Sequence, residues 1–248
     1  MILRPGAIAL LLLIVVDLAM IAIALRLYPA FFSQPDGVFV VLEAVSVLLF
    51  YAGAVVWFGR TTGQDWKTIL EWATPFGLLG GTLEALNIAI ESGAPVAIHT
   101  PTVPIAFMCI VFASWGVAGF RAARSLNSIR AGVLTAVSSA AICMLIAVAA
   151  GFAIEFFAAR PEPAIVLTWG EFKRSGWTDP RAFGLANTLD SAFTHLLIAP
   201  LVALILGGGA SLLTQFRSSK ETSTKPLRSS RSQASSMIEP DGSDRGGK

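Results

Sequence analysis

The stretch GAIALLLLIVVDLAMIAIALRL, residues 6–27, places one acidic residue, Asp17, near the middle of an apolar run. A helix rises about 1.5 Å per residue, so a run of this length can cross roughly 30 Å of hydrocarbon. A carboxylate in hydrocarbon is costly unless it is protonated, hydrogen-bonded, bound to a cation or in contact with water. The stretch therefore predicts a membrane-spanning helix and makes Asp17 a candidate functional residue.

The composition of the whole chain indicates the same class of protein. Of its 248 residues, 54% are hydrophobic and only 14% are charged, and the mean hydropathy of +0.69 is too high for a soluble domain. We predict an all-α integral membrane protein whose residues 1–215 form a bundle of six transmembrane helices. The predicted helices cover residues 6–27, 38–58, 70–90, 103–123, 131–157 and 183–213.

The first segment follows Arg4, as the apolar part of a secretory signal peptide would. However, its apolar run is long and has no clear cleavage site of small residues. We therefore interpret residues 6–27 as a retained helix. Cleavage would instead leave five helices.

The last segment of the chain, residues 216–248, is rich in Ser, basic and almost without apolar residues. Such a segment cannot build a core, so we predict a disordered cytoplasmic tail. Its basic residues could contact anionic lipids, or the tail could only aid solubility. Nothing in the chain resembles a nucleic-acid-binding module.

Basic residues near helix ends predict the orientation, because Lys and Arg resist translocation. Arg60, Lys67, Arg121, Arg124 and Arg130 all lie in connections on one side of the predicted bundle. We therefore expect that side, and both termini, to face the cytoplasm of a plasma or inner membrane. The long outer connection, residues 158–182, contains several aromatic residues and is expected to form an interfacial helix or a flap.

Four more acidic residues, Glu43, Glu84, Glu155 and Asp190, interrupt other predicted helices. Two come late in helices that run outward and two come early in helices that run inward. Counting along alternating helices places all four in the outer half of the membrane, roughly 3 to 11 Å below its surface. Glu155 lies so close to a predicted helix end that an interfacial role is the favoured interpretation, and Glu43 lies only slightly deeper.

Polar and small residues accompany the acids on the same helix faces. Gly77, Gly81, Glu84 and Asn87 recur at steps of three or four residues, so they share one face, and small residues let helices approach closely. Around Asp190, the residues Asn187, Ser191 and His195 recur every four residues. We predict an outward-facing polar pocket centred on Glu84 and Asp190. The candidate substrate- or ion-binding residues are Asp17, Glu43, Glu84, Asn87, Asp190 and His195.

Three functions fit this pattern. The leading hypothesis is a small transporter or permease in which the carboxylates bind a proton or cation and couple it to a solute. The second is an intramembrane enzyme acting on a lipid or lipid-linked substrate, with a carboxylate as general base and His195 as its partner. The third is a structural or assembly subunit whose polar residues only hold helices together.

The chain contains no H-E-x-x-H zinc motif, no Gly-rich phosphate loop and no G-x-S-x-G nucleophile motif. The residues Glu43, Glu84, Asp190 and His195 have the donor types that suit manganese or zinc, but they show no metal-binding spacing. The sequence thus names no cofactor and no catalytic residue. The two cysteines, Cys109 and Cys143, have no C-x-x-C spacing and are expected to be packing residues.

Overall fold

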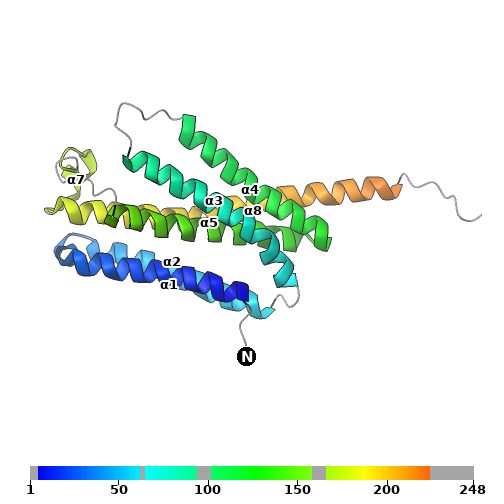
Figure 1. Cartoon of the computed structure of the whole chain (residues 1–248), viewed down its shortest axis with the longest axis horizontal. Coiled ribbons are helices and arrows are strands. Elements are labelled where there is room, and N and C mark those ends of the chain that lie inside the picture. Colours follow the sequence, from blue (N-terminus) through cyan, green and yellow to red (C-terminus); the bar gives the residue numbers. More distant parts are fainter. Residues whose placement is uncertain (1–4, 62–64, 94–101, 158–165, 224–248) are drawn as a thin grey trace, which may run out of the picture.

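A computed structural model describes residues 5–61, 65–93, 102–157 and 166–223. These residues form helices joined by short turns and contain no strand, which confirms the all-helical class (Figure 1). The elements are α1 (Pro5–Leu27), the 3-10 helix η1 (Pro29–Ser33), α2 (Gly37–Thr61), α3 (Asp65–Gly93), α4 (Thr102–Leu126), α5 (Ile129–Phe157), α7 (Gly170–Ser175) and α8 (Pro180–Ser223).

The long helices run back and forth along one axis. Figure 1 shows α1, α3 and α5 running one way and α2, α4 and α8 the other. The central helix is α5, which packs against α1, α3, α4 and α8. One end of the bundle carries η1, α7 and the start of α8, and we call it the η1–α7 end. The opposite end carries the end of α4 and the start of α3, and we call it the Arg121 end.

Five of the described helices are long and apolar enough to cross a membrane, namely α1, α2, α4, α5 and α8. The sequence predicted six crossings, and the helix outside this set is α3. Its apolar run is interrupted by Pro75, Glu84 and Asn87, and its first turns carry charges. Even so, α3 packs along both α4 and α5, so it belongs to the bundle.

Glycines explain how closely α3 approaches α5. A Cβ atom on Gly77 would lie 2.7 Å from the Cβ of Ile142 and 2.8 Å from the carbonyl oxygen of Ser139. A Cβ on Gly81 would lie 2.8 Å from the Cβ of Ile146. These separations are too short for ordinary contacts, so larger residues would force the helices apart. The predicted small-residue face of α3 is thus confirmed as a packing face.

The interior of α8 contains Pro200, and the helix continues through it. Proline has no backbone N–H, so it cannot donate to the carbonyl of residue 196 in the preceding turn. The hydroxyl of Tyr51, on α2, donates a hydrogen bond of 2.6 Å to this Leu196 carbonyl. Because an unsatisfied backbone group is costly in an apolar interior, Tyr51 compensates for the proline and ties α2 to α8.

An aromatic cluster closes the η1–α7 end. The ring of Phe183 lies 5.3 Å from that of Phe172 and 5.7 Å from that of Trp177, and Trp177 lies 5.4 Å from Phe31. All four side chains are buried. In the connection where we expected an interfacial helix or a flap, the structure has the short helix α7, and the side chains of Phe172 and Trp177 are buried against Phe31 and Phe183. Residues 158–165 of this connection lie outside the described residues.

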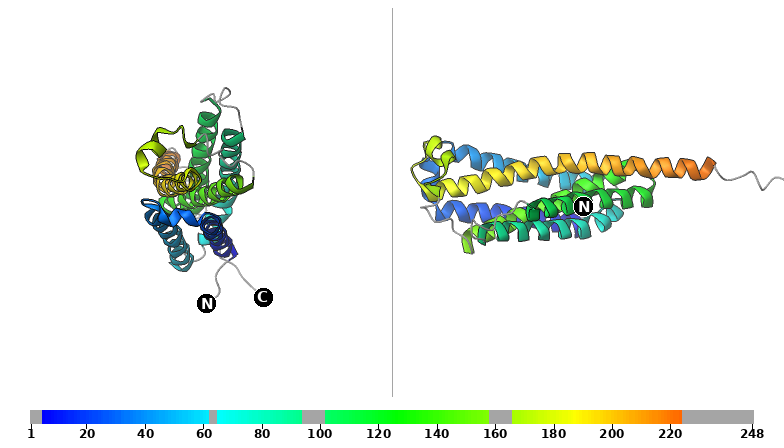
Figure 2. Two further views of the ribbon diagram at one scale, coloured as in Figure 1. Left: turned by 90° about the vertical axis from the view of Figure 1, so that its left-hand side faces the viewer. Right: turned by 90° about the horizontal axis from the view of Figure 1, so that it is seen from above.

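The last helix is longer than the sequence predicted. We expected it to end at residue 213 and the tail to begin at 216, whereas α8 continues to Ser223. Figure 2 shows its orange end extending past the neighbouring helices. The rest of the predicted tail, residues 224–248, lies outside the described residues.

Candidate polar cavity between α3, α5 and α8

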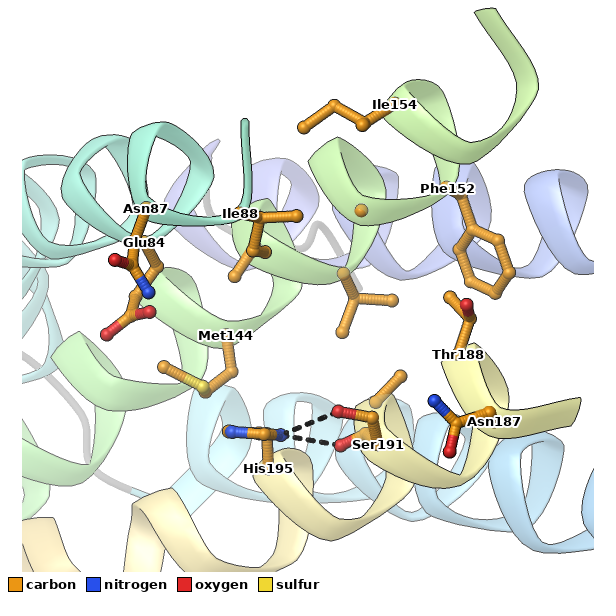
Figure 3. A pocket seen from close by; sticks show the side chains of 14 residues that line it. Glu84, Asn87, Ile88, Met144, Phe152, Ile154, Asn187, Thr188, Ser191 and His195 are labelled. Carbon is orange, nitrogen blue, oxygen red and sulfur yellow. Dashed lines mark hydrogen bonds between the residues drawn. The ribbon is translucent and has the colours of Figure 1, made fainter. Parts of the chain in front are cut away.

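A cavity of about 300 Å³ lies between α3, α5 and α8. Figure 3 shows its walls, with α3 and α8 on opposite sides. The polar residues that line it are Glu84 and Asn87 from α3, and Asn187, Thr188, Ser191 and His195 from α8. The apolar residues are Ile88 from α3, Met144, Ala147, Val148, Gly151, Phe152 and Ile154 from α5, and Ala192 from α8.

Helical spacing explains why these polar groups share one space. Asn187, Ser191 and His195 are four residues apart, so they stack along one side of α8. Glu84 and Asn87 are three residues apart and occupy one side of α3. The polar groups of α3 and α8 therefore line the cavity from two sides. The helix α5 contributes only apolar or small side chains and forms a largely apolar wall between them.

The cavity has an acidic character. Among the residues that the structure places around it, the titratable side chains are Glu84 and His195, and none is Lys or Arg. Amides and hydroxyls provide the other polar contacts. Such a lining suits a proton, a small cation or a hydrogen-bonding solute better than an anion.

The orientation of His195 is set by its own helix. Its Nδ1 atom lies 2.6 Å from the carbonyl oxygen of Ser191 and 3.4 Å from the Ser191 hydroxyl. A carbonyl oxygen can only accept, so Nδ1–H is the donor, and in the neutral ring Nε2 then keeps its lone pair. Figure 3 shows the other ring nitrogen pointing away from Ser191. His195 therefore offers a proton acceptor or a cation ligand.

Three of the sequence-predicted residues, Glu84, Asn87 and His195, come together in this cavity. Asp190, which we expected at its centre, is exposed and does not line it. Successive helix residues are about 100° apart, so Asp190 is turned away from the face that carries Ser191. It shares an exposed side of α8 with Leu197 and Leu201.

The two other candidate residues lie elsewhere. Glu43 is half-buried on α2 and does not line the cavity. Asp17 lies in α1, which packs against α2 and α5, and its side chain is fully buried. Neither carboxylate oxygen of Asp17 has a hydrogen-bond partner among the described residues. Glu155 lies in the last turn of α5, and its side chain is outside the described part of the chain.

A metal centre built from these acids finds no support in the described ranges. There, no group of three or more His, Cys, Asp or Glu residues lies close enough to hold a metal ion. The reason is geometric, because Glu43 lies on α2 and Asp190 lies on another face of α8 than His195, so neither lines the cavity.

Sequence reasoning missed several residues that line the cavity. It did not single out Thr188, which follows Asn187 on α8, or the apolar groups Ile88, Met144 and Phe152. The hydroxyl of Thr188 donates to the carbonyl of Gly184 at 3.2 Å, as many membrane threonines do. Apolar lining residues carry no sequence signal that separates them from ordinary packing residues. For Thr188, the one indication in the sequence was its helical spacing from the other polar residues of α8.

Comparison of the chain with protein-family models, curated proteins and solved structures gives no match.

Proposed function

We propose that the protein is a small membrane transporter whose cavity between α3, α5 and α8 binds a proton or a small cation. The observation that carries this proposal is the lining itself, in which Glu84 and His195 accompany amides and hydroxyls without any Lys or Arg. A carboxylate in such surroundings lowers its free energy by taking up a proton or a cation, and the Nε2 atom of His195 offers a second acceptor. Coupling of that ion to a solute is part of the proposal.

For this function, α3 would be a sixth membrane crossing. In its favour, α3 packs along α4 and α5, and the helices on either side of it in the chain both run in the opposite direction (Figure 1). Polar residues in a crossing helix are tolerated when they face a cavity within the bundle, as Glu84 and Asn87 do. With the Arg121 end in the cytoplasm, the cavity would lie in the outer half of the membrane.

Flux measurements in proteoliposomes test this proposal. The purified full-length chain is reconstituted, a proton or Na⁺ gradient is imposed, and the internal pH or Na⁺ is followed with a trapped dye. Glu84→Gln is expected to reduce the flux by about ten- to a hundredfold, because a contact with a charged group contributes roughly 1.5 to 3 kcal/mol. The matched control is Asp190→Asn, which neutralises a carboxylate on α8 outside the cavity and should leave the flux unchanged.

Two results would contradict the proposal. One is equal flux through wild type and Glu84→Gln when both are folded by the criterion of a monodisperse gel-filtration peak. The other is an equal loss of flux in Glu84→Gln and Asp190→Asn, which would indicate a general effect of charge rather than an effect of the cavity. If the acid substitutions only lowered stability, the structural-subunit hypothesis would be favoured.

The geometry of His195 favours one further candidate function, an enzyme acting on a lipid or lipid-linked substrate. With Nδ1–H held by the Ser191 carbonyl, Nε2 is fixed as an acceptor, which a general base requires. The purified protein would then release a product from added phospholipid, and His195→Gln would abolish it. Absence of any product with wild type at high protein concentration would remove this candidate.

A further inference from the structure

A second cavity, of about 380 Å³, lies at the Arg121 end between α3 and α4. It is lined by Trp72 from α3 and by Phe120, Arg121, Arg124 and Ser125 from α4. Both arginines are exposed, whereas the two aromatic side chains are half-buried. The lining of this cavity therefore combines two half-buried aromatic rings with two exposed cationic side chains. In contrast, the cavity between α3, α5 and α8 has an acidic lining.

The position of Arg121 is set by an aromatic contact. Its guanidinium carbon lies 5.4 Å from the centre of the Trp72 ring, within the range of a cation–π interaction. Arg124 follows three residues later, so the two guanidinium groups lie on one side of α4. Arg121 is thus held in place and still presents its donors to the cavity.

Neither arginine is neutralised by a carboxylate within the described part of the chain. The acidic residue next to Trp72 is Glu71, and its carboxylate pairs with Lys67 on the same helix at 3.7 Å. A cavity with two uncompensated guanidinium groups attracts an anion. The planar donor fork of arginine matches the oxygens of a phosphate group particularly well.

The position of this cavity along the bundle matches the level of lipid headgroups. Arg121 and Arg124 lie in the last turns of α4, which ends at Leu126, and Trp72 lies two turns into α3. A helix rises about 1.5 Å per residue, so these groups lie within roughly 10 Å of their helix ends. Tryptophan and arginine side chains commonly occupy this level.

The face of α4 that carries the arginines continues as an apolar surface toward the middle of the bundle. Ile110, Val117 and Arg124 are seven residues apart, so they lie on one line along the helix. Ile110 and Val117 are exposed, at 47% and 42% respectively. A ligand whose phosphate contacts the arginines would therefore find an apolar track for a hydrocarbon chain directly beside it.

We propose that Arg121, Arg124 and Trp72 form a binding site for the phosphate group of an anionic phospholipid. The guanidinium groups bind the phosphate, Ser125 offers a hydroxyl, and the acyl chains lie along the Ile110 and Val117 side of α4. Inorganic phosphate has the same headgroup chemistry but no chain to occupy the apolar track. The track is what favours a lipid over a soluble phosphate.

The test compares ligands on the detergent-solubilised full-length protein by native mass spectrometry and by thermal stability. The probes are phosphatidylglycerol, phosphatidylcholine and inorganic phosphate. Wild type is expected to bind phosphatidylglycerol about tenfold more tightly than phosphatidylcholine, since each well-placed basic residue contributes to binding of anionic lipid. The double variant Arg121→Gln/Arg124→Gln should lose this preference.

Matched variants separate the site from general charge. Arg60→Gln/Arg130→Gln removes two exposed basic residues from other helices at the same end and should keep the preference. Arg121→Lys/Arg124→Lys keeps the charge but not the donor fork and should retain only part of it.

Three outcomes would overturn the proposal. They are an unchanged preference in Arg121→Gln/Arg124→Gln, an equal loss in Arg60→Gln/Arg130→Gln, and stabilisation by millimolar inorganic phosphate equal to that by phosphatidylglycerol. The last outcome would indicate a site for soluble phosphate. Both arginines are exposed, so their substitution should not disturb folding. Melting curves of the variants without lipid check that they are folded.

Discussion

At the scale of single residues, Asp17 conflicts most with its surroundings. It belongs to the buried stripe of α1 together with Ile14 and Ile21, and its carboxylate oxygens have no hydrogen-bond partner among the described residues. A buried polar group without a partner costs about 1 to 3 kcal/mol. We therefore expect Asp17→Val to raise the free energy of unfolding by about 1 to 2 kcal/mol, measured as a higher melting temperature in detergent.

The control lies one helical turn away on the same stripe. Ile14→Val removes one buried methylene group and should lower the free energy of unfolding by about 0.5 to 1.5 kcal/mol. If Asp17→Val were destabilised as much as Ile14→Val, the carboxyl group would have to form stabilising contacts. Flux through the stabilised Asp17→Val variant adds a second readout, because a stable protein without flux would assign Asp17 a role in ion coupling.

The sequence predicts the height of the site residues along the bundle but not the direction in which each side chain projects. Counting along helices gives the height of a residue in the membrane, and it placed Glu84, Asn87 and His195 at one level, where the structure brings them together. It does not give the rotation of each helix about its axis. Asp190 has the right height but does not line the cavity, because the packing of α8 against α4 and α5 sets the rotation of this helix.

At the scale of secondary-structure elements, Pro200 in α8 gives a sharp prediction. Tyr51→Phe removes the hydroxyl that satisfies the Leu196 carbonyl and should cost about 1 to 3 kcal/mol of stability. In a Pro200→Ala background, the new backbone N–H can donate to the same carbonyl. There, Tyr51→Phe should cost less than about 0.5 kcal/mol, as a double-mutant cycle of melting curves would measure.

The other tyrosine of the chain serves as the control. Tyr28→Phe removes a hydroxyl just after the end of α1, beside Pro29 but on another helix than Pro200, and should change stability little in either background. An equal cost of Tyr51→Phe with and without Pro200 would show that its hydroxyl does not act through the carbonyl that the proline leaves open.

The helices themselves were largely predictable because each apolar run is bounded by polar or basic residues. Their ends were not, since charged residues extend α3 back to Asp65 and α8 forward to Ser223 beyond the apolar cores. The contact between Tyr51 and Leu196 joins residues 145 positions apart. No local pattern indicates such a pairing, although the proline that requires it is visible in the sequence.

At the scale of the whole molecule, the number of crossings depends on α3. If α3 crosses the membrane, its two ends lie on opposite sides, and the basic residues at the Arg121 end favour the cytoplasm for that end. Single cysteines at exposed positions test this arrangement in a chain whose Cys109 and Cys143 are replaced by Ala. Suitable positions are Ser33 in η1, Asp65 at the start of α3 and Thr102 at the start of α4.

We expect a membrane-impermeant maleimide added to intact cells to label Ser33→Cys and Thr102→Cys, and Asp65→Cys only after permeabilisation. The positions at 65 and 102 flank α3, so opposite labelling requires that α3 crosses. Labelling of both from the same side would leave five crossings and place the polar face of α3 outside the hydrocarbon, which would remove the physical basis for an ion site within the membrane. The opposite pattern at all three positions would keep six crossings but open the Glu84 cavity toward the cytoplasm, because the cavity and the η1–α7 end lie in the same half of the bundle.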